Sequence, residues 1–127
     1  MTHVLLIGQR PETVDFADPA IPPGLNAEEI NAGIALAMIK MWERGLEADV
    51  CLVPPDETAS LLLEKKLTTT TYDCVVIGAG IRLPPKSLPL LETVINTVHK
   101  VAPSASIAFN TRPEDTAEAA ARWLRAD

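Results

Sequence analysis

YDCVVIGAG, residues 72–80, is the stretch of sequence that decides the fold. After Asp73 the chain is apolar without interruption through Ile77, where a half-buried strand would alternate apolar and polar residues. Such a continuous run is typical of a strand buried on both faces of a parallel sheet. Three other segments have the same character, and they lie at residues 4–7, 49–53 and 105–109.

Each apolar run is followed by a helical pattern. Segment 27–44 spaces Ile30, Ile34 and Ala37 three or four positions apart, which places them on one stripe of a helix. The same reasoning predicts helices over 56–66, 88–100 and 113–125. Acidic residues gather in the first turns and basic residues in the last turns, which complements the helix dipoles. The threonines at 68–71 predict a loop or an early start of the third strand.

The alternation of strands and helices predicts an α/β fold. Right-handed crossovers then require a parallel sheet with helices on both faces. We expect a single (βα)4 domain over residues 1–127, because this length fits one domain. It should be a small doubly wound, flavodoxin-like (Rossmann-like) three-layer sandwich of four parallel strands in the order 2-1-3-4.

Charge and composition exclude several classes of partner. The net charge is −6, with 11 basic and 17 acidic residues, so neither nucleic acid nor an anionic membrane is expected as a partner. The opening MTHVLLIG lacks the features of a signal peptide, which predicts a cytoplasmic protein. Cys51 and Cys74 lie inside apolar runs and should pack as small buried hydrophobes; a disulfide would require neighbouring strands.

Ligands of open parallel sheets bind beyond the carboxyl ends of the strands, where the strand order reverses. In the expected order this place lies between the first and third strands. The loops there and after the fourth strand carry Arg10, Arg82 and Arg112, which are three of the six arginines. Arginine prefers carboxylate or phosphate, so we predict an anion-binding crevice. The predicted ligand-binding residues are Gln9, Arg10, Glu12, Gly78, Gly80, Arg82, Asn110, Thr111 and Arg112.

A second interpretation of these cations stays open. Lys86 adds a further cation at the same end of the sheet, but acidic residues are also present there. The arginines would then pair with local carboxylates and not with a ligand. The acids concerned are Glu12, Asp15, Asp18, Asp56, Glu57 and Asp115.

The connection over 8–26 is long and rich in proline. Its 19 residues exceed the ~2–6 residues typical of such connections. We expect a lid over the crevice or a segment that docks on a second subunit; the alternative is a surface loop whose apolar residues cap the core. Ten of the eleven prolines follow strands, so they should stiffen the same end of the sheet.

Two resemblances bear on cofactors. YDCVVIGAGI is similar to the opening of the dinucleotide-binding fingerprint, V-x-I-G-x-G, but Leu83 replaces its third glycine. Pro84 and Pro85 should then prevent a helix from starting on schedule, so no cofactor is expected. The architecture also resembles a response-regulator receiver domain, whose phosphorylated aspartate would fall at Gly78. No Cys/His cluster has metal-ligand spacing, so we predict no metal site.

Two functions are therefore compatible with the sequence. The first is a small cytoplasmic α/β protein that binds an anionic small molecule, a carboxylate or a phosphate, with or without catalysis. The alternative is a non-catalytic, receiver-like module for protein interaction or dimerisation. A homodimer is expected in either case, because a four-stranded sheet leaves two unpaired edges. We expect the side chains of Met38, Met41 and Trp42 to extend onto an exposed patch.

Overall fold

Four parallel strands form the central sheet, and the structure, a computed structural model, describes residues 2–124. The strands are β1 (His3–Gln9), β2 (Glu47–Val53), β3 (Cys74–Ile77) and β4 (Ser106–Phe109). Their order is β2-β1-β3-β4, and every neighbouring pair is parallel. The predicted fold class, strand number and strand order are therefore confirmed.

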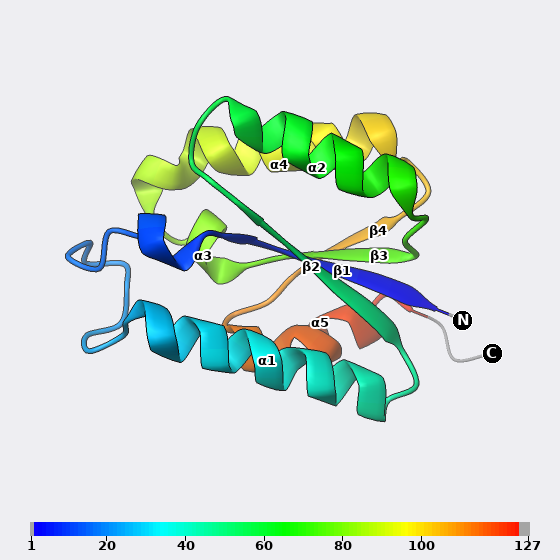
Figure 1. The fold of residues 1–127 in the computed structure, drawn as a ribbon, viewed down its shortest axis with the longest axis horizontal. Coiled ribbons are helices and arrows are strands. Elements are labelled where there is room, and N and C mark those ends of the chain that lie inside the picture. The colour runs from blue at the N-terminus through cyan, green and yellow to red at the C-terminus, as the bar shows by residue number, and fades with distance from the viewer. Residues whose placement is uncertain (1, 125–127) are drawn as a thin grey trace.

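Helices cover both faces of the sheet. They are α1 (Ala27–Glu43), α2 (Thr58–Thr69), α3 (Ala79–Arg82), α4 (Leu88–Val101) and α5 (Thr116–Ala121). Three 3-10 turns join them: η1 (Pro11–Thr13), η2 (Pro85–Ser87) and η3 (Pro113–Asp115). Helices α2 and α4 lie on one face and α1 and α5 on the other, as Figure 1 shows with the sheet seen nearly edge-on. The result is a flavodoxin-like three-layer sandwich.

Successive side chains of each strand point to opposite faces, which gives the sheet two different cores. On the α2/α4 face, large aliphatic residues such as Leu5, Ile77 and Leu63 pack together. The α1/α5 face uses smaller residues, because β4 contributes Ala108 and helix α5 contributes three alanines. The free thiols of Cys51 and Cys74 are divided between these two cores, so neither lies within reach of the other.

Two predicted boundaries were wrong. Thr68 and Thr69 are neither loop nor strand but the end of α2, because their hydroxyls donate to the carbonyls of Lys65 and Lys66 in the preceding turn. The last helix, predicted over 113–125, begins as the η3 turn and continues as α5 only to Ala121. Residue 125 lies outside the described part of the chain.

The segment after β3 also differs from the prediction. A helix does start directly after Gly78, but it is the single turn α3, and the chain resumes a long helix only at Leu88. The two prolines thus interrupt the helix without delaying its start: Leu83 is still helical, and Pro84 is extended because Pro85 disfavours a helical conformation in the residue before it. At the other predicted loop, 8–26, Gly8 and Gln9 belong to β1, so the connection begins after Gln9.

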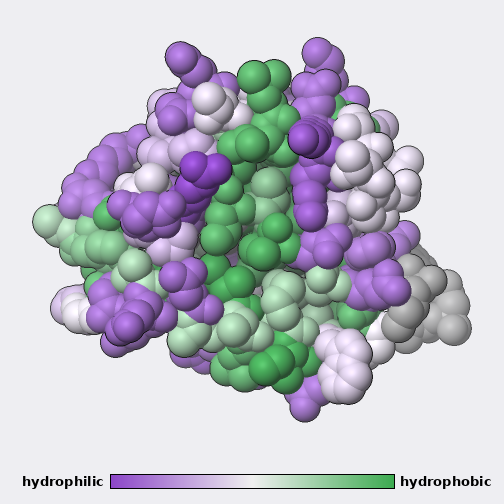
Figure 2. Space-filling model, viewed as in Figure 1, coloured by the Kyte–Doolittle hydropathy of each residue, from purple (hydrophilic) through white to green (hydrophobic). Residues whose placement is uncertain are grey.

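The surface over the edge strand β2 is partly apolar. Figure 2 shows an apolar stripe that crosses this side of the molecule from α2 to α1. Trp42 is 75% exposed and Met38 is half-buried, but Met41 is fully buried in the α1/α5 core, so its predicted place on the patch was wrong. Within residues 2–124, no helix is long and apolar enough to cross a membrane.

Candidate functional site

A cavity of about 310 Å³ opens at the carboxyl edge of the sheet, beside the ends of β1 and β3. This is the place where the strand order reverses. Strand ends, helix α1, the connection after β1 and the turn after β4 all contribute to its wall. Its lining includes Gly8, Gly78, Leu52, Ile21, Ile30, Ile34, Asn110 and Arg112.

Two strand ends that line the cavity are glycines and carry no side chain. Side chains at even positions of β1 point to the α1/α5 face, so Gly8 leaves a gap just beyond Leu6. Gly78 does the same after Val76 at the end of β3. A Cβ atom on Gly78 would lie 3.1 Å from the carbonyl oxygen of Ile7, so the close approach of these backbones also requires glycine.

Asn110 holds the inner end of the site together. It is almost fully buried, and its Oδ1 accepts a hydrogen bond from the Ala79 N–H at 2.8 Å. Its Nδ2 donates to the Thr116 hydroxyl at 3.1 Å. One side chain thus ties the end of β4 to the first residues of both α3 and α5. Its orientation is fixed by these contacts and not by a ligand.

The connection after β1 forms one wall of the cavity. Val14, Ala20, Ile21 and Leu25 all line it, and Ile21 is buried. At the start of the connection, Gln9 Nε2 donates to the carbonyl oxygen of Thr13 at 3.0 Å and to its hydroxyl at 3.1 Å. The segment therefore forms one side of the cavity, and whether it acts as a lid stays a prediction.

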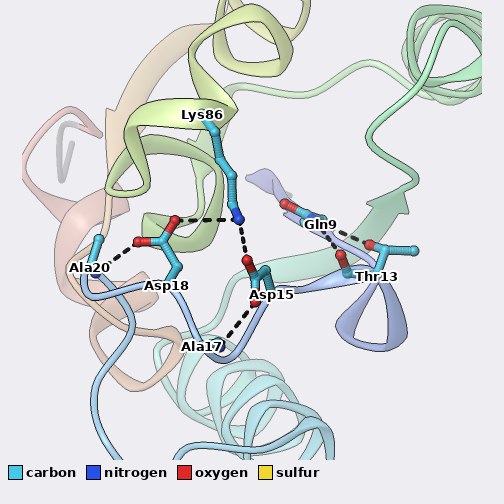
Figure 3. A network of polar contacts seen from close by, with 7 residues as sticks. All are labelled: Gln9, Thr13, Asp15, Ala17, Asp18, Ala20 and Lys86. Atoms are coloured by element: carbon cyan, nitrogen blue, oxygen red, sulfur yellow. Dashed lines mark hydrogen bonds and ion pairs between the residues drawn. The ribbon is translucent and has the colours of Figure 1, made fainter.

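An ion-pair cluster, Lys86 with Asp15 and Asp18, fastens this wall; we call it the clasp. Lys86 Nζ donates to Asp15 and lies 3.7 Å from the Asp18 carboxylate (Figure 3). The hydrogen bond from Lys86 holds the pKa of Asp15 below its usual value, and Asp15 in turn raises the pKa of Lys86. The fourth cation at this edge is thus paired with local acids.

A second cavity, of about 400 Å³, lies on the other side of the connection, beside the clasp. All three clasp residues line it, so its wall carries charged groups beside apolar ones. Prolines after the strands contribute to both cavities, with Pro22 in the first and Pro84 in the second. The prolines therefore do surround the carboxyl edge of the sheet.

The three arginines predicted at this edge point to different places. Arg82 Nη2 donates to the Asn110 carbonyl at 2.9 Å, and its guanidinium lies 5.9 Å from the centre of the Phe109 ring. Its Nε is buried without a hydrogen-bond partner among the described residues. Arg10 lies toward β2. Two hydrogen bonds from Thr58 are the main cause that lowers the pKa of Asp56, and the charge of Arg10 lowers it further. Only Arg112 of the three lines the first cavity.

The structure brings six of the nine predicted residues around the cavity: Gln9, Gly78, Gly80, Asn110, Thr111 and Arg112. Arg10, Glu12 and Arg82 are outside its lining. Thr111 donates to Asp115 through both its N–H and its hydroxyl. Burial acts to raise the pKa of Asp115, but these hydrogen bonds and the nearby Arg112 charge bring it below its usual value. Whether the nine residues bind a ligand stays a prediction.

Sequence reasoning missed the apolar wall and two acids at the site. Ile30 and Ile34 were placed on the apolar stripe of α1; both line the cavity, and Ile34 also packs against the α1/α5 core. Glu29 and Glu114 line the cavity as well. Gly33 lets α1 approach the η3 turn, because a Cβ atom there would lie 2.8 Å from Glu114 Oε1. The glycines at the strand ends were visible in the sequence. They could indicate a cavity only once it was known which face of the sheet each position points to.

The arrangement is suited to binding an apolar body with a polar end. Most of the lining is apolar, and the exposed Arg112 and Thr111 stand beside Glu29 and Glu114. Among residues 2–124, no group of three or more His, Cys, Asp or Glu side chains could hold a metal ion. Comparisons with protein-family models, curated proteins and solved structures found no match to this chain.

Proposed function

We propose that this protein binds a small molecule with an apolar body and one anionic group, in the cavity beside β1 and β3. The observation that carries the proposal is the apolar cavity at the point where the strand order reverses. Its volume of about 310 Å³ lies at the lower end of the ~300–1,000 Å³ range of ligand pockets. A ligand of modest size fits best, and catalysis is not part of the proposal.

The charges around the cavity favour a carboxylate over a phosphate. Arg112 supplies a guanidinium that can form charge-assisted hydrogen bonds with an anion. Glu29 and Glu114 line the same cavity and would repel a group with two negative charges. A ligand with one carboxylate at Arg112 and its apolar part between Ile34 and Ile21 would pair with the guanidinium and carry only one negative charge near the two acids.

A thermal-shift and calorimetry screen tests the proposal. It compares straight-chain and aromatic monocarboxylates with the matching alcohols, the matching phosphates and inorganic phosphate. We expect apolar carboxylates to raise the melting temperature most and inorganic phosphate to have no effect. Arg112→Gln should weaken binding of carboxylates but not of alcohols. If no compound of any class raises the melting temperature, the proposal is wrong.

A matched pair of variants on α1 locates the binding site. Ile34→Trp places a large side chain in the cavity and should abolish binding. Ile39→Trp makes the same change at a position that is 54% exposed on the same helix, and it should leave binding unchanged. Equal loss of binding in both variants, or in neither, would place the ligand elsewhere.

The alternative, a non-catalytic interaction or dimerisation module, is also kept as a proposal. The observation that favours it is the open edge of β2 beneath the apolar stripe (Figure 2). A cytoplasmic location is likewise proposed, and two free buried cysteines support it, because free thiols are usual in reducing compartments. Sedimentation of the purified protein tests the dimer, as detailed below.

A further inference from the structure

We propose that β2 pairs antiparallel with β2 of a second copy, about a twofold axis at Val50, so that one continuous sheet crosses the dimer. This inference does not depend on ligand binding. It gives the interaction module a surface, a partner and a register. Two observations support it: open backbone groups along the strand, and an apolar surface beside it.

The backbone of β2 has a free row of hydrogen-bonding groups. The Glu47 N–H donates to the Thr2 carbonyl, and the Val53 carbonyl accepts from the Arg10 N–H, both at 2.9 Å. Odd-numbered residues of β2 therefore face β1, since N–H and C=O of one residue point the same way in a parallel strand. The groups of Ala48, Val50 and Leu52 face outward. Within residues 2–124, no side chain hydrogen-bonds to them.

The opposite edge of the sheet, strand β4, is less available for pairing with another strand. Strand β4 has only four residues, and Arg122 Nη2 donates to the outward carbonyl of Phe109 at 2.9 Å. A side chain on an edge carbonyl blocks further strand pairing. Strand β2, with seven residues and no such contact, is the edge on which a second copy can add.

Apolar surface lies on both sides of the open edge. Figure 2 shows the apolar stripe running from α2 across β2 to α1. The two helices that flank the strand also carry exposed hydrophobic residues, among them Leu62 on α2, which is 37% exposed, and Trp42 on α1, which is 75% exposed. When two copies join at β2, the α1 helices meet on one face of the joined sheet and the α2 helices on the other. The exposed apolar residues are then covered together with the strand edge.

Charges along β2 do not oppose the proposed axis. Glu47 and Asp49 lie in its amino-terminal half, and their side chains point to the same face as Cys51. Both acids lie 3.4 Å from His3 of their own copy, and Asp49 also accepts a hydrogen bond from Tyr72. Antiparallel pairing about Val50 puts Asp49 of one copy opposite Cys51 of the other, so no acid of β2 meets itself. Lys66 lies on α2, which packs on this same face.

The pairing also satisfies the outward groups one by one. Val50 faces Val50 of the second copy, and Ala48 faces Leu52. All three are residues whose N–H and C=O point outward, so these become hydrogen-bonded pairs. A shift of the register by one residue would place inward-facing groups opposite outward-facing ones. The register about Val50 is therefore the one to test.

Sedimentation equilibrium across a dilution series, with hydrogen exchange, tests the proposal on the full chain. We expect a reversible dimer in which the amides of Ala48, Val50 and Leu52 exchange slowly when concentrated and rapidly when diluted. The inward amides of Asp49 and Cys51 should stay protected throughout. A protein that is monomeric at every concentration, or a dimer without this alternation, would overturn the proposal.

Two substitutions and one control separate the backbone from the charges. Val50→Pro removes an outward N–H without breaking a bond to β1, and should raise the dimer dissociation constant about a hundredfold or more. Lys66→Glu places an acid near the acids of the second copy and should raise it about tenfold. The control, Lys65→Glu, changes the same charge at an exposed position and should have little effect.

Loss of the dimer can be distinguished from loss of ligand binding. Circular dichroism checks that Val50→Pro is folded, and Lys66→Glu repeats the test without any change in the strand. Both variants should keep the thermal shift with an apolar carboxylate. Loss of the dimer with retained ligand binding supports the proposal; a dimer unchanged in both variants assigns association to another surface and overturns it.

Discussion

The two faces of the sheet end differently at the carboxyl edge. On the α2/α4 face, Ile77, Ile81 and Leu90 carry the core out to the last residues of the strands. On the α1/α5 face, the corresponding strand ends are Gly8 and Gly78, and the cavity opens beside them. One sheet thus has a face that is packed throughout and a face that is hollow at one end.

The difference shows that the site arises from residue size and direction more than from charge. Both faces receive residues from the same strands, and only the alternation of side chains decides which face a residue fills. A glycine at an even position opens the α1/α5 face, while its neighbours at odd positions keep the other face closed. The hollow end is then covered by the connection after β1 and its clasp.

The largest expected effect comes from two adjacent leucines. Leu5 is fully buried on the packed face, and Leu6 borders the cavity on the hollow face. Leu5→Ala should lower the free energy of unfolding by ~3–5 kcal/mol, and Leu6→Ala by ~2–3 kcal/mol, because less surrounding contact is lost beside an existing cavity. Urea denaturation measures both. Equal losses would contradict the difference between the faces.

A smaller and opposite pair of effects is expected at two glycines of the site. Gly78→Ala brings its Cβ within 3.1 Å of the Ile7 carbonyl oxygen, and crowding against backbone should cost ~1–3 kcal/mol. Gly80 lies within the α3 turn with nothing within 4 Å of a Cβ, so Gly80→Ala should stabilise by ~0.5–1 kcal/mol. Thermal denaturation compares them. Stabilisation by both changes would mean that the strand ends are not tightly held.

The smallest effect on global stability is expected at the clasp, because Lys86 and Asp15 are exposed and solvent weakens their ion pair. Lys86→Met should leave the unfolding midpoint nearly unchanged but speed amide exchange at Ile21, whose N–H donates to the Asp18 carbonyl. Lys100→Met, an exposed change on α4, is the control. Slow exchange at Ile21 in both variants would show that apolar packing alone holds the wall.

The clasp should also weaken at both extremes of pH. The pKa of Asp15 is lowered in the folded protein, so its contribution is present above its unfolded pKa of ~3.9 and is lost as pH falls through the folded value. The pKa of Lys86 is raised, so its contribution is present below ~10.4 and is lost as pH rises through the folded value. Exchange at Ile21, corrected for intrinsic rates, should be slowest relative to a model peptide between these limits.

The sheet could be predicted because its information is local. Four uninterrupted apolar runs mark strands buried on both faces, and chain connectivity then limits their order. The helix ends were less certain, because the hydroxyls of Thr68 and Thr69 extend α2 by bonds that composition does not reveal. The long connection was recognised by its length, and its role as a wall followed from the apolar residues it carries.

The site was predicted in place but not in character. The three arginines suggested an anion-binding crevice, yet Arg82, at the end of the single turn α3, contacts a carbonyl and an aromatic ring. Only the register of the strands shows that Gly8 and Gly78 open onto one face. Ile30 and Ile34 looked like core because a helical stripe is the same whether it meets a sheet or a cavity.

The two cysteines have a practical consequence for the purified protein. Cys51 pairs in register with Ile7 on one side of β1, and Cys74 pairs with Val4 on the other, so two strand spacings of ~4.8 Å and a difference in face separate them. A disulfide needs Cα atoms within ~7 Å. Burial also raises the pKa of the Cys74 thiol to about 11, which keeps it protonated and unreactive. Any intramolecular disulfide in a preparation therefore marks chains that were oxidised while unfolded.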